Sequence, residues 1–284
     1  MRPTGSAGEA RRARLTAPPR PVDARRNFMT SSTSPERHSQ ARPIHTGCAG
    51  WALSSRVAGR FPSDGSHLER YARVFSSVEI NSSFYRPHQP KTYARWAAST
   101  PDAFRFSVKL PRRISHELRL RDADAALIEF LAQVESLKEK LGCLLLQLPP
   151  SLALDEGAAR RFFSLLRSAT ETPVVCEPRH ATWFSEAGAA TLREAGIGCV
   201  RADPPPVADA QPIGDPRISY FRLHGSPRIY ESAYDAPFID ALAARLTEAR
   251  RAGSEAWCIF DNTARGEAIP NALMLTAKLQ TAHR

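Results

Sequence analysis

From residue 44 onward, short apolar runs of strand length alternate with longer stretches that have the period of a helix. The runs cover residues 44–48, 78–81, 104–109, 143–148, 174–177, 198–201, 218–224 and 256–261. This alternation is typical of βα units that build a parallel sheet. Eight such units in about 240 residues match the usual size of a (β/α)8 barrel. The sequence therefore predicts an α/β fold of the TIM-barrel type, as a single domain over residues 43–284.

A doubly wound open sheet is the alternative fold for the same alternation. The glycine-rich phosphate-binding motifs of many open sheets, G-x-G-x-x-G and G-x-x-x-x-G-K-[ST], follow none of the runs. Because open sheets without these motifs also exist, their absence favours the barrel without excluding the open sheet.

The first 42 residues differ in composition from the rest of the chain. They are rich in Arg, Pro and Ser. They contain nine arginines and only three acidic residues, so more than half of the formal net charge of +10 lies here. Large apolar residues are too few to bury a core, which predicts a disordered basic tail. Translation starting at Met29 is a second hypothesis, under which residues 1–28 are not part of the natural protein. The weakly charged remainder gives little support to a basic nucleic-acid-binding body.

The cysteines indicate the cellular compartment, and the apolar runs indicate whether the chain can cross a membrane. The five cysteines are widely spaced, lie mostly in apolar stretches and include no C-x-x-C pair, so we expect buried, reduced thiols and a cytoplasmic protein. The longest apolar run is far shorter than the roughly 20 residues that cross a bilayer. No contact with a membrane is expected.

Most of the predicted strands become polar at their carboxyl ends, where barrel enzymes carry their chemistry. A buried charge costs several kcal/mol unless it is paired, so these residues form either a salt-bridge layer or a functional site. As catalytic candidates the sequence offers Glu177 and Glu79 for acid/base work, His224 and His116 for proton transfer, Lys109, and Asp261. Lys109 could form a Schiff base, hold an anion, or pair with Glu79 on the neighbouring strand.

A second set of residues is predicted to bind the ligand. Arg179 and Arg222 would stabilise negative charge, and the loops after the last two strands could hold an anion. The aromatic residues of this set wall a pocket or, alternatively, pack in the core. The set comprises Asn81, Tyr85, Gln147, Arg179, Trp183, Asp203, Arg222, Arg228, Tyr230, Asn262 and Arg265.

A metal site is left open but is not favoured. Glu177, His224 and Asp261 could converge in space, yet the chain has no H-x-H or H-E-x-x-H motif. No metal ligand is therefore assigned, and the cofactor and the oligomeric state stay unknown.

Several segments, in their order along the chain, resemble the domain of unknown function 72 family, the YecE-like proteins of bacteria. They are Gly47–Trp51, Val78–Tyr85, Phe106–Lys109, Ser115-His116, Leu146–Pro150, Glu177–His180, Tyr220–Gly225 and Asp261–Thr263. The resemblance covers about residues 44–279 and implies a TIM-barrel fold, but it supplies no reaction. The chain departs from the family in having Asp261 where Asn is common, which adds a carboxylate beside the expected anion loops.

Three classes of function follow. The first is an enzyme, hydrolase-like or lyase-like, that acts on a small polar or anionic ligand, such as a phosphorylated one, by acid/base chemistry at the carboxyl end of the barrel. The second is a protein that binds or processes nucleic acid. The third is a non-catalytic scaffold, which is expected if the strand-end charges are fully paired.

Overall fold

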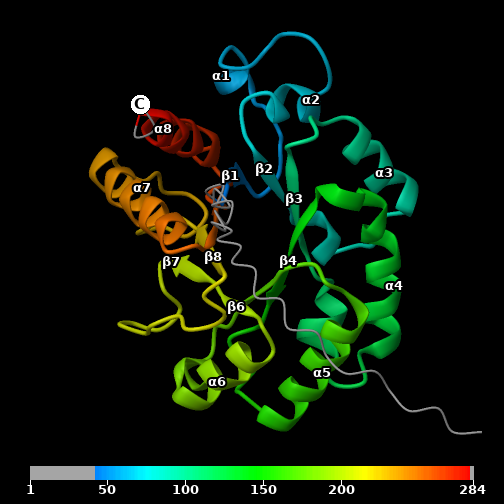
Figure 1. Cartoon of the computed structure of the whole chain (residues 1–284). Coiled ribbons are helices and arrows are strands. Elements are labelled where there is room, and N and C mark those ends of the chain that lie inside the picture. The colour runs from blue at the N-terminus through cyan, green and yellow to red at the C-terminus, as the bar shows by residue number, and fades with distance from the viewer. Residues whose placement is uncertain (1–41, 282–284) are drawn as a thin grey trace, which may run out of the picture. The chain divides into compact units, whose positions relative to one another are not determined.

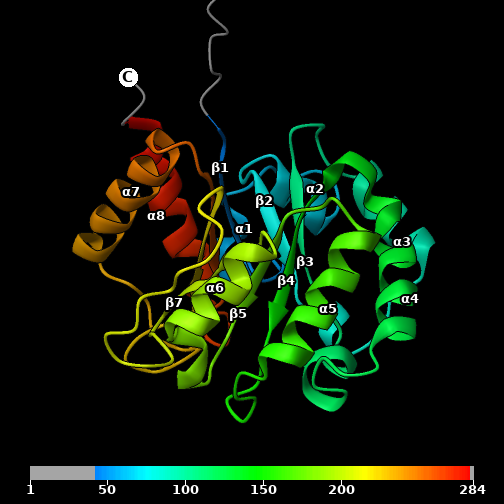
Figure 2. The same ribbon diagram turned by 60° about the horizontal axis from the view of Figure 1, so that its bottom comes forward.

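The computed structural model describes residues 42–281 of the chain, and these residues form an α/β barrel (Figures 1 and 2). The predicted tail and the Met29 start lie outside the described residues. The strands are β1 (Ile44–Cys48), β2 (Ser77–Ile80), β3 (Arg105–Lys109), β4 (Leu141–Gln147), β5 (Val174–Glu177), β6 (Gly198–Cys199), β7 (Arg201–Asp203), β8 (Ile218–Leu223) and β9 (Glu255–Phe260).

All paired strands run parallel, in two ladders of order β1-β9-β8-β7 and β2-β3-β4-β5-β6. The predicted sixth strand is interrupted at Val200 and appears as two segments. β6 pairs with β5, where Val200 N also donates to Cys176 O (2.8 Å), whereas β7 pairs with β8 in the other ladder. The eight predicted strands thus appear as nine segments. The predicted TIM-barrel fold is confirmed.

The second junction between the ladders lies where β1 meets β2. A side chain at Gly47 would place its Cβ 2.0 Å from Ser77 O, so only glycine allows the two backbones to come this close. The buried hydroxyl of Tyr71 accepts from Cys48 N (2.7 Å) and donates to Ser77 O (3.1 Å). The phenol therefore bridges β1 and β2, which form no ladder with each other in the described part of the chain.

Helices cover the outside of the barrel, with α3, α4 and α5 on one side and α7 and α8 on the opposite side (Figure 1). They are α1 (Ser55–Ala58), α2 (His67–Ala72), α3 (Pro90–Ala98), α4 (Asp124–Val134), α5 (Glu156–Ala169), α6 (Glu186–Glu194), α7 (Ala236–Arg251) and α8 (Ala268–Thr281). Most of these helices begin at a local signal in the sequence. Ser66 and Glu69 form a reciprocal capping box at α2, and Asp155 and Asp235 cap α5 and α7.

Apolar side chains from the strands and the inner helix faces form the core around the barrel wall. The five cysteines are buried free thiols, as expected for small apolar residues in such a core. Within residues 42–281, none of the helices has both the length and the apolar character needed to cross a membrane.

The Tyr71 hydroxyl should contribute measurably to stability. Tyr71→Phe leaves the buried Cys48 N–H without a partner, and we expect a loss of about 1–3 kcal/mol in the free energy of unfolding by urea. Tyr93→Phe is the matched control, because Tyr93 is equally buried but its hydroxyl bridges no strands. Equal losses in the two variants would show that the bridge is not what holds β1 to β2.

Candidate functional site

Arg222, on β8, lies at the centre of a buried group of charged side chains inside the barrel, near the carboxyl ends of the strands. Its guanidinium donates to both oxygens of Glu79 on β2 (2.8 and 3.0 Å) and to Glu177 on β5 (3.1 Å), and it forms an ion pair with Asp261 after β9 (2.9 Å). All four residues are at most 4% exposed. One cation thus joins carboxylates from three different parts of the barrel wall.

His224 and Arg179 complete this network. The imidazole of His224 bonds through Nδ1 to Asp261 (3.1 Å) and through Nε2 to Glu177 (3.2 Å). Arg179 donates two hydrogen bonds to Glu177 (2.8 and 3.0 Å), and the side-chain amide of Gln147 donates one (3.0 Å). We call Glu79, Glu177, Arg179, Arg222, His224 and Asp261 the charge network.

Two carboxylates of the network, Glu177 and Asp261, are held ionised. Burial raises the pKa of Glu177, but the charge of Arg222 and the hydrogen bond from His224 outweigh it, so the pKa lies well below the usual range. The same opposition lowers the pKa of Asp261. Burial lowers the pKa of His224, but its hydrogen bonds to Asp261 and Glu177 outweigh this effect. The pKa of His224 is therefore raised above its usual value, which favours the imidazolium.

Lys109, at the end of β3, lies beside the network without joining it. Its side chain is 4% exposed and its Nζ lies 4.1 Å from the centre of the Phe84 ring. The ammonium forms no ion pair or hydrogen bond with any residue in the range 42–281. The pair with Glu79, one of the alternatives that the sequence left open, does not form, because Glu79 binds Arg222 and Tyr220. Burial and the nearby charge of Arg222 lower the pKa of Lys109 to about 8, against the opposing effect of the carboxylates.

His116 approaches the same region from a short π-helical turn, η2 (Arg113–Glu117). Its ring lies 5.0 Å from that of Phe84, and its Nδ1 is 2.9 Å from Ser115 Oγ. Burial, followed by the charge of Lys109, lowers the pKa of His116. The two candidate histidines therefore differ in state, with His116 shifted toward the neutral form and His224 toward the charged form.

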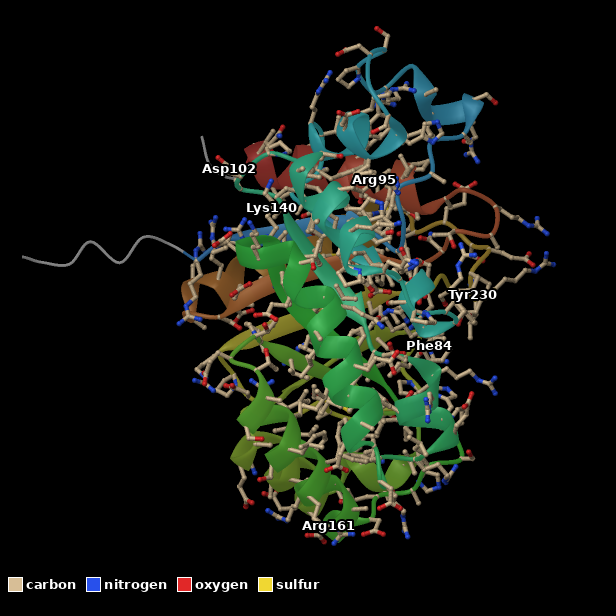
Figure 3. All side chains as sticks on the ribbon, turned by 90° about the vertical axis from the view of Figure 1, so that its right-hand side faces the viewer. Phe84, Arg95, Asp102, Lys140, Arg161 and Tyr230 are labelled. Carbon is tan, nitrogen blue, oxygen red and sulfur yellow. The ribbon has the colours of Figure 1, made fainter. Side chains whose placement is uncertain are left out.

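The predicted ligand-binding residues separate into those near the network and those outside it. Tyr230 lies over His224 (5.7 Å between rings), and Tyr85 is 75% exposed. Figure 3 shows Phe84 and Tyr230 at the same end of the barrel, whereas Asp102 and Lys140, which precede β3 and β4, lie at the other. The backbone of Tyr230 has φ 68°, a left-handed conformation that is strained for a bulky residue.

Other predicted residues bind protein groups away from the charge network. Trp183 is buried and donates to Leu152 O (3.0 Å), so it packs in the core. Asp203 accepts from Tyr234 (2.9 Å), and Asn262 donates to Ser232 O and Asn271. Arg228 and Arg265 are exposed and pair with Glu231.

Asn81 lies just after β2, and its buried Oδ1 has no hydrogen-bond partner among the described residues. A buried acceptor without a donor is costly, and Oδ1 of Asn262 also has no partner among the described residues. The Glu177, His224 and Asp261 side chains do converge as the sequence suggested. They surround Arg222, however, and in the described part of the chain no cluster of His, Cys, Asp or Glu is arranged to hold a metal ion.

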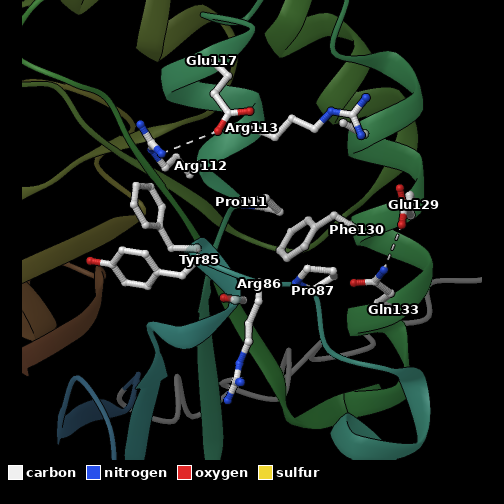
Figure 4. A pocket seen from close by; sticks show the side chains of 13 residues that line it. Tyr85, Arg86, Pro87, Pro111, Arg112, Arg113, Glu117, Glu129, Phe130 and Gln133 are labelled. Atoms are coloured by element: carbon white, nitrogen blue, oxygen red, sulfur yellow. Dashed lines mark hydrogen bonds and ion pairs between the residues drawn. The ribbon is translucent and has the colours of Figure 1, made fainter.

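A hollow of about 270 Å³ opens beside Phe84, between the loops after β2 and β3 and helix α4 (Figure 4). Phe84, Tyr85, Pro87, Pro111 and Phe130 supply its apolar walls, and Arg86, Arg112, Arg113, Glu117 and Glu129 lie around them. Among the described residues, Arg112 is the only one of these three arginines that forms an ion pair (with Glu117, 3.8 Å). Phe84 lines this hollow and also contacts Lys109.

One buried participant, Tyr220, is absent from the predicted site. Its hydroxyl binds Glu79 (3.0 Å) and Ser107 Oγ (2.9 Å). Tyr220, Arg222 and His224 alternate along one strand and therefore share the inward face. This two-residue period is the signal that could have identified Tyr220.

The charge network should be essential for folding, because removal of Arg222 leaves three buried carboxylates facing one another. Arg222→Leu is expected to lower the free energy of unfolding by about 3–5 kcal/mol. Arg73→Leu, which breaks the exposed pair of Arg73 with Asp64 (2.9 Å), is the control and should cost at most about 1 kcal/mol. Both free energies are measured by urea unfolding. Equal losses in Arg222→Leu and Arg73→Leu would show that the charge network is not essential for folding.

The raised pKa of His224 predicts a pH dependence of stability. A group whose pKa is higher in the folded state stabilises the fold fully below the unfolded value, about 6.5 for histidine, and loses that effect as the pH rises through the folded pKa. His224→Gln should therefore cost more at pH 6 than at pH 9, by urea unfolding at both values. A cost that grows with pH would show that His224 is buried in its neutral form.

Comparison with known proteins agrees with this architecture. Residues 45–284 match the model of the family described as "Protein of unknown function DUF72". The UPF0759 protein YecE of Escherichia coli is 35% identical over 150 residues, which are 51% of this chain and 55% of YecE. The UPF0759 protein YunF of Bacillus subtilis is 23% identical over 150 residues, or 50% and 52% of the two chains. The chain thus spans about half the length of these two relatives.

Two solved structures cover nearly the whole barrel. The DUF72 family protein TM1631 of Thermotoga maritima is 25% identical with a TM-score of 0.71, over 84% of this chain and 99% of that one. The DUF72 family protein EF0366 of Enterococcus faecalis is 20% identical with a TM-score of 0.69, over 84% and 96%. The family match extends over most of the chain and includes every strand-end residue described above, and the chain therefore belongs to the DUF72 family.

Proposed function

We propose that the carboxyl end of the barrel is the active site of an enzyme that binds a small anionic ligand and acts on it by acid/base chemistry. The observation that carries this proposal is the isolated charge of Lys109. Glu79, Glu177 and Asp261 are matched in charge by Arg222, Arg179 and the imidazolium of His224. Lys109 adds a seventh charge to these six, and it has no counter-ion among the described residues. A buried charge without a partner is costly, and a bound anion would remove that cost.

Arg222 takes no direct part in ligand binding under this proposal. Its three nitrogen atoms are engaged by carboxylates, and its side chain is 1% exposed. Its role is to fix Glu79, Glu177 and Asp261 in place. Among the cations of the site, Lys109 has no carboxylate partner within residues 42–281 and Arg179 is partly exposed, so we assign ligand binding to these two.

The hollow beside Phe84 supports an anionic ligand. Three arginines and two glutamates give its rim an excess of positive charge, which raises the local concentration of anions. The apolar wall formed by Phe84, Tyr85 and Phe130 suits the carbon skeleton of a small molecule. Because Phe84 also contacts Lys109, the Phe84 side chain would separate an anion in the hollow from the buried ammonium.

The opposite pKa shifts of His116 and His224 support acid/base chemistry. Pairs of titratable groups whose surroundings push their pKa values apart are typical of general base and general acid. Neutral His116 can accept a proton, and charged His224, oriented by Asp261 and Glu177, can donate one. The strained backbone of Tyr230 over His224 is of a kind that clusters at functional sites.

The proposal is tested by thermal unfolding of wild type, Lys109→Met and Lys138→Met with inorganic phosphate, citrate and sugar phosphates. An anion at 100 times its dissociation constant should stabilise wild type by about 2.7 kcal/mol. Lys138→Met, which removes an exposed lysine, should keep this shift, and Lys109→Met should lose it while remaining folded.

Two outcomes would contradict the proposal. Equal stabilisation of Lys109→Met and wild type would place the anion elsewhere. Stabilisation by oligonucleotides alone, falling steeply with salt, would instead favour a nucleic-acid-binding protein.

A further inference from the structure

We propose that Lys109 forms a Schiff base with the carbonyl carbon of an aldehyde or ketone group in the substrate. This inference rests on the proposed function, because it makes the anionic ligand a carbonyl compound and Lys109 the group that binds it covalently. Lys109 is then a nucleophile as well as a charge.

The position of Lys109 leaves its nitrogen free to react. Ser83 Oγ donates to the backbone oxygen of Lys109 (2.6 Å), which ties the end of β3 to the turn after β2. The aliphatic stem is buried, and Nζ meets the face of Phe84 without a hydrogen bond to any described residue. Lys140 shows the opposite arrangement, because its Nζ donates to Ala97 O (2.7 Å) and Thr100 O (2.5 Å).

The surroundings also favour the neutral amine, which is the reactive form. A lysine becomes nucleophilic when it is desolvated or lies near another cation. Lys109 meets both conditions, since it is buried beside Arg222, and its pKa of about 8 leaves a substantial neutral fraction at mildly alkaline pH. A lysine that served only to hold an anion would gain nothing from this loss of charge.

The reaction balances with the groups present. The neutral amine adds to the carbonyl carbon while the C=O bond opens, and the oxygen takes up a proton to give a carbinolamine. Loss of that hydroxyl as water leaves a protonated imine, so the ammonium and the carbonyl compound together become an iminium and one water molecule. His116, neutral and in contact with Phe84 beside Lys109, is placed to accept the ammonium proton and return it to the departing hydroxyl.

The product keeps the electrostatic balance of the site. The protonated imine carries the same single positive charge as the ammonium, so the charge network meets no new unpaired charge. The imine is larger and less hydrated than an ammonium, which suits a nitrogen already packed against an aromatic ring. An anionic group elsewhere on the substrate remains within the influence of Arg179 and of the arginines around the hollow.

The test uses the full chain with pyridoxal 5′-phosphate or pyruvate, followed by reduction with sodium cyanoborohydride, which converts an imine into a stable secondary amine. Because the chain has only five lysines (91, 109, 138, 140 and 278), peptide mass mapping assigns each adduct. We expect Lys109 to be labelled at least tenfold faster than exposed Lys91 and Lys138, with a half-maximal rate near pH 8. Lys109→Arg keeps the positive charge but cannot form an imine, and it should lose the fast adduct.

The outcomes separate this inference from the proposed function. If anions stabilise the protein in a Lys109-dependent way but neither carbonyl compound is trapped at Lys109, the Schiff base is wrong and the anion site stands. If neither stabilisation nor trapping depends on Lys109, both proposals fail. Similar labelling rates at Lys91, Lys109 and Lys138 would overturn the inference, whereas fast labelling of Lys109 alone supports it.

Discussion

The contact of Arg222 with three carboxylates is the interaction on which the rest of the barrel interior depends. A guanidinium presents its donors in a fixed plane, so one side chain can hold Glu79, Glu177 and Asp261 at the same time. These carboxylates come from β2, from β5 and from the residue after β9, which lie around the barrel rather than along one edge. Neither a lysine nor an apolar residue at position 222 could orient them in this way.

The environment of Lys109 follows from this arrangement. Because Arg222, Arg179 and His224 already engage the carboxylates, the charge network is complete without Lys109. The scaffold interpretation requires all strand-end charges to be paired, and the buried Lys109, which forms no ion pair within residues 42–281, does not fit it. An isolated buried lysine lowers stability below its pKa, so its presence is better explained by a ligand than by folding.

Much of this site could be predicted from the sequence, because strand ends of a parallel barrel meet at one face. The positions of Glu79, Lys109, Glu177 and Arg222 followed from strand periodicity and polarity alone. Their partners did not, because the pairing across a barrel depends on strand stagger, which leaves no trace in a single sequence. Hence the sequence left open a pair between Lys109 and Glu79 on the neighbouring strand, whereas Glu79 reaches across the barrel to Arg222.

Loop residues were the least predictable for a related reason. Trp183, Arg228 and Arg265 follow strands, but their side chains are placed by loop contacts with Leu152 and Glu231. The charge network is paired, whereas Lys109 and His116, the groups proposed to meet a ligand, owe their lowered pKa values mainly to burial, and both contact Phe84. Ionic pairing around Arg222 and an apolar surface at Phe84 are opposite environments, and Lys109, the proposed nucleophile, is influenced by both.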